Sequence, residues 1–260
     1  MPPPSPALVI IPTYNERENI AAAVERVLDA VPDIHVLVVD DGSPDGTGEI
    51  ADRLARDDAR VHVMHRNGKR GLGPAYIDAF RRGADEGYDV LIEMDADGSH
   101  PAESLPTMLA VLDGDVGHRI GGVVGSRWVP GGSVVDWPWT RQFISRGGST
   151  YARAMLGLKL RDVTSGYRVY RAEAVQRIDL DQVDSTGYCF QIDMSRRILG
   201  AGYGLVEVPI TFRDREFGDS KMNSSIVVEA MAKVTAWGVQ RVLGRRPTQS
   251  VDSRPPLNHG

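Results

Sequence analysis

Residues 7–127 alternate short apolar runs, rich in β-branched residues, with stretches of helical periodicity. The apolar runs are nearly continuous, which is typical of strands buried on both faces of a parallel sheet. The predicted strands are Ala7–Pro12, Ile34–Asp40, Val61–His65, Val90–Asp95 and Ile120–Ser126. The predicted helices lie between them, near Glu18–Ala30, Gly46–Arg56, Pro74–Glu86 and Pro101–Leu112. This order predicts an α/β fold with a mostly parallel central sheet flanked by helices.

Two short motifs predict where helices begin. Asn15 is followed three residues later by Glu18, which resembles a capping box. Ser43 precedes Pro44, which would place a capping hydroxyl before a proline at the first helical position. Both motifs support the helices predicted near Glu18–Ala30 and Gly46–Arg56.

The chain beyond residue 127 is less regular. Trp128–Thr140 is rich in Gly, Pro and Trp and lacks periodicity, so we expect a loop over the sheet edge. Helices are predicted at Arg141–Leu156 and Phe190–Leu199, and a strand at Leu205–Arg213. Ile226–Leu243 has the pattern of an amphipathic helix, with a polar face made by Glu229, Lys233 and Gln240.

These segments predict one domain over residues 7–243, because a chain of 260 residues can bury a substantial core. Its parts are residues 7–127, residues 128–222 and the helix at 223–243. Residues 1–6 are proline-rich and are predicted to be a flexible leader. Residues 247–260 are polar and contain several prolines, which predicts a disordered tail.

Composition narrows the class of protein. The net charge of −5 gives no overall basic field, so we expect no nucleic-acid partner. The single cysteine, Cys189, rules out an internal disulfide, fits a reducing compartment and is expected to be a small buried residue. No run of about 18 uncharged apolar residues occurs, so no segment is predicted to span a bilayer. We expect a soluble or peripherally attached protein.

Two carboxylates follow the fourth predicted strand. Its apolar run leads to Asp95 and Asp97, one residue apart, in a Gly-Ser turn. Hard cations such as Mg²⁺ or Mn²⁺ prefer oxygen ligands and keep positions open for substrate phosphates. Ligands of open α/β sheets bind at the carboxyl ends of strands. The pair therefore predicts a metal that would neutralise a diphosphate leaving group.

Two further strand ends carry polar motifs, within Pro12–Glu16 and Val39–Thr47. Tyr14 can cover a nucleobase, while Glu16 and Asp41 can accept hydrogen bonds from base N–H groups or ribose hydroxyls. Each motif alone would also suit a helix cap or a solvated turn. Their occurrence in this order with the acidic pair favours a nucleotide-diphosphate site.

Cationic residues downstream could meet the anions of such a ligand. Arg127 follows the fifth strand, and Arg141 lies one turn from Ser145 on a predicted helix, so both can face one phosphate. Arg215 and Lys221 belong to a charged loop after the last strand.

Other classes fit less well. The first strand is not followed by the Gly-x-Gly-x-x-Gly of dinucleotide enzymes, and no phosphate-binding Walker sequence occurs. A receiver-type signalling module would use Asp40, Asp41 and Asp95, but it leaves Pro12–Glu16 and the second half unexplained. A phosphatase would carry its Asp-x-Asp on the first strand. The six histidines show no zinc spacing, and His100 beside the acidic pair is expected to be a turn residue.

The combined motifs resemble those of the polyprenol- or dolichol-phosphate mannose synthases, which are family 2 glycosyltransferases of GT-A fold. The matching segments are 12–19 (PTYNEREN), 39–47 (VDDGSPDGT), 71–76 (GLGPAY), 94–101 (MDADGSHP), 125–132 (GSRWVPGG), 145–147 (SRG), 162–168 (DVTSGYR), 187–191 (GYCFQ) and 217–221 (FGDSK). The likeness covers roughly residues 7–243, and the last five segments are the most specific for transfer to polyprenyl phosphate.

The resemblance implies a role for each matched residue. Guanosine of GDP-mannose would be held by Pro12, Tyr14, Glu16, Val39 and Asp41. The diphosphate would lie at Asp95, Ala96 and Asp97, with the two aspartates binding Mg²⁺ or Mn²⁺. The lipid phosphate would be held by Arg127, Arg141 and Ser145. A loop closing over the donor would carry Arg215 and Lys221. Some members have Gln at the position of Ser99, so no third side-chain ligand is implied. The residues implied in the reaction itself are Asp97, Arg127 and Arg141.

The implied reaction moves mannose from GDP-mannose to polyprenyl monophosphate with inversion, and residues 7–127 and 128–222 would be the donor and acceptor halves. A UDP-glucose or UDP-amino-sugar donor remains an alternative. The resemblance also implies a cytoplasmic protein that is peripheral on the cytoplasmic face of a membrane, and a small membrane-protein subunit in some members. The helix at Ile226–Leu243 could lie at an anionic membrane surface, pack on the domain, or do both.

Overall fold

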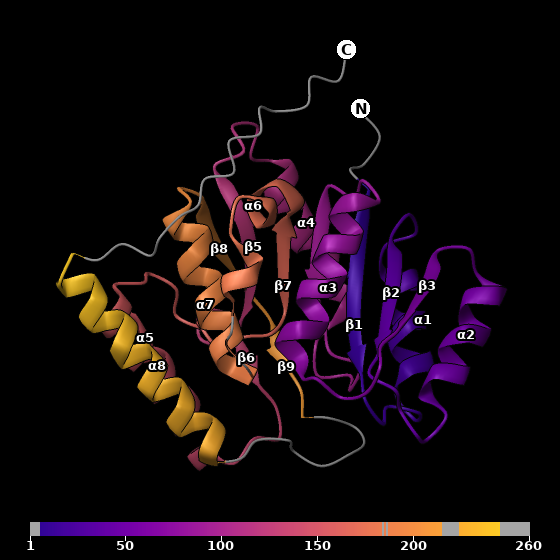
Figure 1. The fold of residues 1–260 in the computed structure, drawn as a ribbon, viewed down its shortest axis with the longest axis horizontal. Coiled ribbons are helices and arrows are strands. Elements are labelled where there is room, and N and C mark those ends of the chain that lie inside the picture. The colour runs from indigo at the N-terminus through magenta and orange to yellow at the C-terminus, as the bar shows by residue number, and fades with distance from the viewer. Residues whose placement is uncertain (1–5, 184, 186, 215–223, 245–260) are drawn as a thin grey trace.

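The computed structural model describes residues 6–183, 185, 187–214 and 224–244. Within them, one sheet has the strand order β3-β2-β1-β4-β7-β5-β8, with helices packed on both faces (Figure 1). The strands are β1 (Ala7–Thr13), β2 (His35–Asp40), β3 (Val61–His65), β4 (Val90–Glu93), β5 (Ile120–Ser126), β6 (Ser133–Val134), β7 (Arg168–Arg171), β8 (Gly204–Pro209) and β9 (Thr211–Phe212). The helices are α1 (Ile20–Ala30), α2 (Thr47–Asp57), α3 (Leu72–Asp85), α4 (Leu105–Asp113), α5 (Trp139–Leu156), α6 (Ala172–Gln176), α7 (Gly187–Gly200) and α8 (Ser224–Val242), with 3₁₀ turns at Ala102–Ser104 and Leu180–Gln182.

The sheet is mostly parallel, as predicted. β1 to β4 pair in parallel, and so do β5 and β8. β7 runs antiparallel between β4 and β5, with Arg168 opposite Glu93. The sequence did not predict β7 or α6, because the four residues of β7 include two arginines and do not form an apolar run. Arg168 is nevertheless fully buried, since its guanidinium donates to Ser165 O, Val163 O and the Ser195 hydroxyl.

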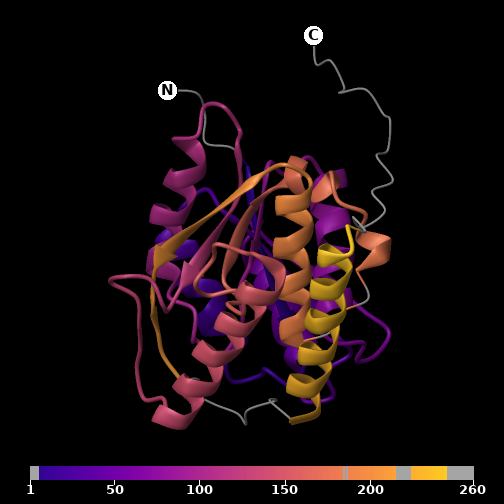
Figure 2. The ribbon, with the colours of Figure 1, turned by 90° about the vertical axis from the view of Figure 1, so that its left-hand side faces the viewer.

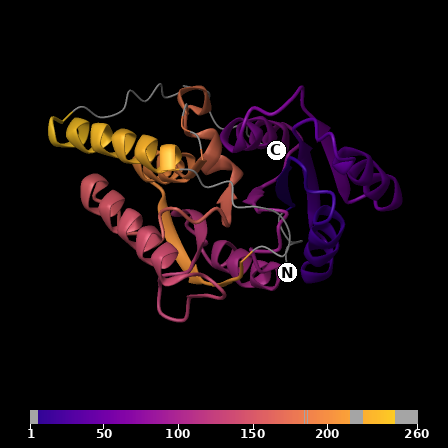
Figure 3. The same cartoon turned by 90° about the horizontal axis from the view of Figure 1, so that it is seen from below.

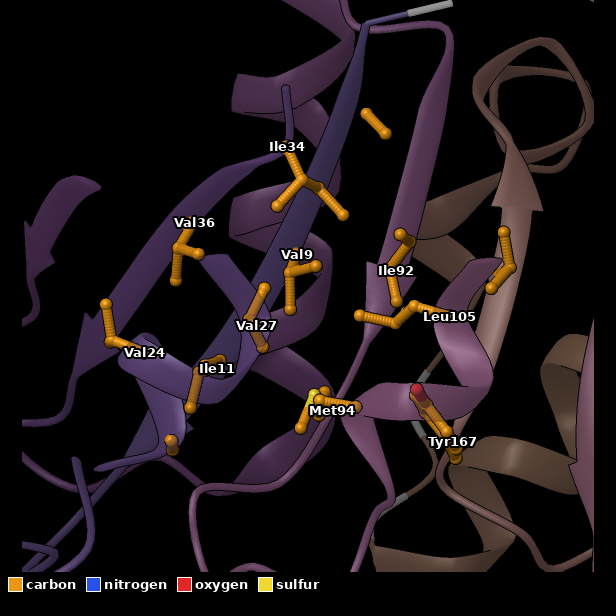
Figure 4. Close-up of a cluster of buried hydrophobic side chains, with 14 of the residues drawn as sticks. Val9, Ile11, Val24, Val27, Ile34, Val36, Ile92, Met94, Leu105 and Tyr167 are labelled. Atoms are coloured by element: carbon orange, nitrogen blue, oxygen red, sulfur yellow. The ribbon is translucent and has the colours of Figure 1, made fainter. Parts of the chain in front are cut away.

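The two faces of β1 build two separate cores. Val9 and Ile11 pack with Val27 of α1 and Leu105 of α4 (Figure 4). Leu8 and Ile10 point the other way, toward the side chains of α3 and α7. Strands that bury both faces need apolar residues at successive positions, which explains the continuous runs in the sequence.

Helices α5 and α8 lie side by side at one end of the molecule (Figures 2 and 3). Val234 is buried between them, and the Tyr151 and Thr235 hydroxyls are 2.6 Å apart. The Arg196 guanidinium of α7 stacks over Trp237 at 4.7 Å, which ties α8 to the domain. The predicted helix at Ile226–Leu243 is confirmed by α8. No helix in the described part of the chain has both the length and the apolar character to cross a membrane.

The predicted helices near Glu18–Ala30 and Gly46–Arg56 are confirmed by α1 and α2, but neither capping motif forms as expected. Asn15 has a positive φ of 60° and its N–H donates to the Ser43 hydroxyl, so α1 begins only at Ile20. The Ser43 hydroxyl donates to Asp40 instead of capping a helix, and α2 begins at Thr47. The Asn15 N–H bonds across to the neighbouring strand end, 28 residues away, which a local capping pattern cannot reveal. The bond from the Ser43 hydroxyl to Asp40 instead reaches back only three residues.

The region after Arg127 also differs from the prediction. Trp128–Thr140 contains the short strand β6, which pairs with β9. The predicted strand at Leu205–Arg213 is split into β8 and β9. The predicted leader, apart from Pro6, and the predicted tail at 247–260 lie outside the described residues.

Candidate active site

The polar motifs after β1 and β2 meet at the carboxyl edge of the sheet. In the parallel register Thr13 lies beside Asp40, and the Thr13 hydroxyl donates to its carboxylate at 3.2 Å. Glu16 N–H donates to the Thr47 hydroxyl at 3.0 Å. The two loops therefore form one hydrogen-bonded surface. Pro12 and Val39 are register partners directly beneath it.

A basic loop that follows β3 completes this surface. The nearly buried Asp41 accepts from the Arg66 guanidinium at 2.5 Å and from Arg70 N–H at 3.1 Å. The Lys69 ammonium lies 4.4 Å from the centre of the half-buried Tyr14 ring. Sequence reasoning missed Arg66 and Lys69, although a basic run directly after a strand of the same edge would have been the signal.

The acidic pair follows β4 at the same edge. The Asp97 side chain is nearly buried and its Oδ1 accepts from Ser99 N–H at 3.1 Å, whereas Asp95 is 41% exposed. Ala96 is buried between them. The backbone thus fixes Asp97, while the Asp95 carboxylate faces outward.

His100 supports the turn and is not placed as a third ligand. Its Nδ1 accepts from Asp95 N–H at 3.0 Å, and its ring stacks on Tyr167 with centroids 5.0 Å apart. Burial lowers the pKa of His100, so the imidazole is neutral and carries its proton on Nε2. That N–H is 4.0 Å from the nearer Asp95 oxygen.

The residues of this turn fit a hard divalent cation. Asp95 and Asp97 offer only oxygen donors, and the buried Ser99 hydroxyl beside them has no hydrogen-bond partner within the described residues. No cluster of three or more His, Cys, Asp or Glu suited to a metal occurs in that part of the chain. The remaining coordination positions would therefore fall to ligand oxygens and water, as Mg²⁺ commonly requires.

Beneath the acidic turn lies a carboxyl that the sequence did not single out. Glu93 is fully buried, and neither of its oxygens has a hydrogen-bond partner among the described residues. Burial raises the pKa of Glu93 to about 8, although the nearby Arg168 guanidinium acts in the opposite direction. Glu93 is therefore mostly protonated at neutral pH, which avoids a third negative charge under Asp95 and Asp97.

Arg127 forms a buried ion pair after β5. Its Nε and Nη2 donate to the two oxygens of Asp162 at 2.7 and 2.6 Å, and Asp162 is fully buried. The guanidinium carbon lies 5.4 Å from the ring centres of Trp128, Trp137 and Phe212. Nη1 has no hydrogen-bond partner within the described residues, so it is the nitrogen available to an anion.

Arg127, Arg141 and Ser145 line one cavity of about 330 Å³ between α5, α7 and α8. The Arg141 guanidinium stacks on Trp137 at 3.9 Å and donates to Asp214 at 2.9 Å. The buried Ser145 hydroxyl has no hydrogen-bond partner in the described chain. The rest of the cavity is mostly apolar, so cations meet a space suited to hydrocarbon.

The structure thus gathers the predicted residues into two groups. One group lies at the carboxyl edge of the sheet, and the other lines the cavity. Sequence reasoning missed Asp162 and Trp137, although the motif segment 162–168 contains the first of them. Arg215 and Lys221 lie outside the described residues.

Comparison with known proteins identifies the family. Residues 8–179 match Glycosyl transferase family 2. The chain is 54% identical to a polyprenol monophosphomannose synthase of Mycolicibacterium smegmatis, covering 94% of this chain and 91% of the relative. It is 56% identical to an undecaprenyl-phosphate mannosyltransferase of Micrococcus luteus, covering 89% and 93%. A dolichol-phosphate mannosyltransferase of Pyrococcus furiosus is 36% identical, covering 87% and 62%.

Solved structures confirm the predicted GT-A fold. The mannosyltransferase PcManGT from Pyrobaculum calidifontis, in complex with GDP-Man and Mn²⁺, superposes with a TM-score of 0.60 at 16% identity, covering 94% of this chain and 66% of that one. Glucosyl-3-phosphoglycerate synthase from Mycobacterium tuberculosis, with Mn²⁺ and UDP-glucose among its ligands, gives 0.58 at 20% identity, covering 94% and 81%. The chain belongs to glycosyl transferase family 2 and, within it, to the polyprenyl-phosphate mannosyltransferases.

Proposed function

We propose that this chain transfers mannose from GDP-mannose to a polyprenyl monophosphate, with inversion, and releases GDP. The observation that carries the proposal is the pairing of an acidic nucleotide edge with a cavity that joins arginines to an apolar lining. A metal-bound sugar nucleotide needs the acidic edge, and a lipid phosphate needs a cavity that combines arginines with an apolar lining. The names of the similar proteins agree with mannose transfer to a polyprenyl phosphate, and the structurally similar PcManGT is in complex with GDP-Man.

The donor would lie along the carboxyl edge of the sheet. Guanosine is assigned to Pro12, Tyr14, Glu16, Val39 and Asp41, and the diphosphate to Asp95, Ala96 and Asp97. Arg215 and Lys221 are assigned to a loop that covers the donor. The outward-facing Asp95 and the fixed Asp97 would hold Mg²⁺ or Mn²⁺, and the presence of Mn²⁺ with sugar nucleotides in two related folds favours a divalent metal.

The acceptor phosphate would be bound at the mouth of the cavity. Arg127 is anchored by Asp162, which leaves Nη1 to contact a phosphate oxygen, and Arg141 and Ser145 approach from α5. Burial of an arginine without a counter-charge is costly, so Asp162 balances the charge of Arg127 and orients its guanidinium before the lipid arrives. The first units of the hydrocarbon chain would occupy the apolar part of the cavity.

Catalysis in this site would consist of positioning and charge balance. The second pKa of a phosphate monoester is about 6 and the first is far lower, so the nucleophile arrives ionised and needs no strong base. Arg127 and Arg141 would hold its oxygen in line with the anomeric carbon. When bound, the cation would supply charge neutralisation for departing GDP. At neutral pH the mostly protonated Glu93 and the neutral His100 add no further charge beneath the diphosphate.

The reaction can be tested with labelled sugar donors. We expect label from GDP-mannose, but not from UDP-glucose, to enter organic-extractable lipid when polyprenyl phosphate is present. EDTA should remove the transfer, and Mg²⁺ or Mn²⁺ should restore it. Transfer from UDP-glucose alone would keep the fold and site but replace the donor, whereas metal-independent transfer would contradict the role of the aspartates.

The same proposal places α5 and α8 against a membrane, with the protein peripheral on the cytoplasmic face. Apolar side chains on both helices are exposed, with Trp139 at 76%, Phe143 at 73% and Val242 at 83%. Phe143 also lines the cavity, so the exposed apolar surface continues into the proposed acceptor site. A lipid substrate could enter from the bilayer without crossing water.

Membrane attachment predicts a specific loss of binding. Phe143→Glu replaces an exposed aromatic side chain by a charge and should lower partitioning onto anionic lipid vesicles by about tenfold or more. Vesicle sedimentation measures this partitioning. Val116→Glu is the matched control, because Val116 is 93% exposed but lies between α4 and β5. Equal losses in both variants would contradict the assigned surface.

A further inference from the structure

Helix α5 carries two adjacent glycines, Gly147 and Gly148, near its centre. Glycine is among the least favourable residues in a helix interior, because it loses the most backbone freedom on folding. Two in succession therefore weaken α5 unless the empty space beside them is useful. The proposed function uses Ser145 of the motif segment 145–147 but gives Gly147 no role.

Close packing does not require either glycine. Apart from the nearby backbone of α5 itself, a Cβ at Gly147 or Gly148 would meet no atom of the described residues within 4 Å. The glycines Gly73, Gly83 and Gly238 also lie in helices, but there a Cβ would come closer than 3.0 Å to a neighbouring residue. Those three glycines allow close contacts, whereas the pair in α5 leaves a space open.

That space is the cavity of about 330 Å³ beside α5. Both glycines are exposed and line it. Each stands four residues after one lining residue and four before another, and these four residues are Phe143, Ile144, Tyr151 and Ala152. Residues four apart share one face of a helix. The face of α5 that lines the cavity therefore lacks side chains in its middle, between larger residues on either side.

The two ends of the cavity indicate which ligand fits it. Toward the amino end of α5, Arg127 Nη1 and the buried Ser145 hydroxyl have no hydrogen-bond partner within the described residues, which suits an anion. Toward the carboxyl end, Ala152 and Val234 form an apolar contact between α5 and α8. A cavity of about 150 Å³ holds a six-carbon ring, so about 330 Å³ has room for about two five-carbon isoprene units.

We propose that Gly147 and Gly148 are specificity-determining residues that keep the cavity open for the first two isoprene units of the acceptor. The inference rests on the proposed function, because it requires the acceptor phosphate to lie at Arg127 and Arg141. Helical side chains lean toward the preceding turn. The side chain added by Gly148→Leu would therefore lie between the arginines and Ala152, in the path of the hydrocarbon chain.

Alanine at these positions tests whether the fold needs glycine. Gly148→Ala should raise the melting temperature by about 2–4 °C, because alanine favours the helix and its methyl group meets open space. Thermal unfolding of the full chain measures this change. A lower melting temperature in Gly148→Ala would show that glycine serves the fold and would contradict the proposal.

Leucine tests the path of the acceptor chain. With GDP-mannose as donor, the kcat/KM of Gly148→Leu should fall at least about tenfold more for farnesyl phosphate than for dimethylallyl phosphate, which has a single isoprene unit. Thr150→Leu is the matched control, because Thr150 is an exposed α5 residue outside the described lining of the cavity. Its ratio for the two acceptors should equal that of the wild type. Equal losses for both acceptors in Gly148→Leu would overturn the proposal.

Thiol labelling gives a readout that needs no turnover. Cys189 is the only cysteine of the chain and is buried, so Gly148→Cys adds a single accessible thiol. At a fixed detergent concentration, farnesyl phosphate at about ten times its Kd should slow maleimide labelling of Gly148→Cys by about tenfold, and inorganic phosphate should not. Thr150→Cys should be labelled at the same rate with and without farnesyl phosphate.

The outcomes separate this inference from the proposed function. Unchanged labelling of Gly148→Cys by a concentration of farnesyl phosphate that raises the melting temperature would overturn the inference. Full suppression of labelling by detergent alone would do the same, because the cavity would then accept any apolar chain. A wild-type protein that transfers no mannose and is not stabilised by farnesyl phosphate would instead contradict the proposed function itself.

Discussion

Replacement of Asp97 by Asn is expected to lower the turnover of mannosyl transfer by about 10²–10³-fold or more. The substitution keeps the size of a nearly buried side chain and leaves the oxygen that accepts from Ser99 N–H. It removes the negative charge that would hold the divalent cation against departing GDP. The fold should remain intact, because Asn keeps the volume of the side chain and the hydrogen bond from Ser99 N–H. Turnover at saturating metal and substrates, with a melting curve for each protein, measures both effects.

Asp52→Asn is the control for this result. Asp52 is a partly exposed carboxylate of α2 that pairs with His65 on the surface, so its loss should change neither turnover nor stability by much. Substantial activity of Asp97→Asn in the presence of EDTA would exclude the metal role assigned to Asp97. A loss of turnover that higher Mn²⁺ concentrations restore would instead assign Asp97 to metal affinity alone.

The sequence was sufficient for the parts of the fold that depend on local pattern. The continuous apolar runs of β1, β2 and β4 identify buried parallel strands, and parallel strands end at a common edge. It follows that Asp41 and Asp97, although 56 positions apart, lie along the same edge. The structure confirms that both residues follow the carboxyl ends of neighbouring parallel strands.

The sequence was insufficient where a contact joins distant residues. Asn15 was expected to cap the first helix, but its N–H donates to the Ser43 hydroxyl, 28 positions away. The strand β7 is short and charged, and its burial depends on the hydrogen bonds that Arg168 donates to Val163 O and the Ser195 hydroxyl. The cavity lined by Arg127 and Arg141 forms only when α5 lies beside α8. The hydrogen bond between these helices joins Tyr151 and Thr235, which are 84 positions apart. Amphipathic periodicity predicts each helix, but it does not predict which other helix packs beside it.

The partner of Arg127 could not be predicted for the same reason, since Asp162 is 35 positions away. The resemblance assigned Arg127 to the lipid phosphate and to the reaction itself, and implied no structural role. The structure adds that two of its nitrogens are already used by a buried carboxylate. Arg127 therefore has a structural role that must be separated from any role in binding.

Asp162→Leu is expected to destabilise the protein by about 3–5 kcal/mol, because it leaves the Arg127 guanidinium buried without its counter-charge. Arg127→Met should cost a similar amount, since Asp162 is then unpaired at zero exposure. The double variant Arg127→Met/Asp162→Leu should recover part of this stability, because an apolar pair can replace a buried ion pair. Recovery is incomplete because the backbone N–H at position 127 loses its acceptor on Asp162. Denaturant unfolding of the three variants measures the interaction.

The double variant separates packing from phosphate binding. If Arg127 contacts the acceptor, the restored fold should bind GDP normally but should use polyprenyl phosphate at least about tenfold less well, since one charge-assisted contact is gone. The matched control is Arg82→Met/Glu86→Leu, which removes a partly exposed ion pair at the end of α3. A double variant at Arg127 and Asp162 with normal acceptor use would show that Arg127 stabilises the domain and that Arg141 and Ser145 suffice for the phosphate.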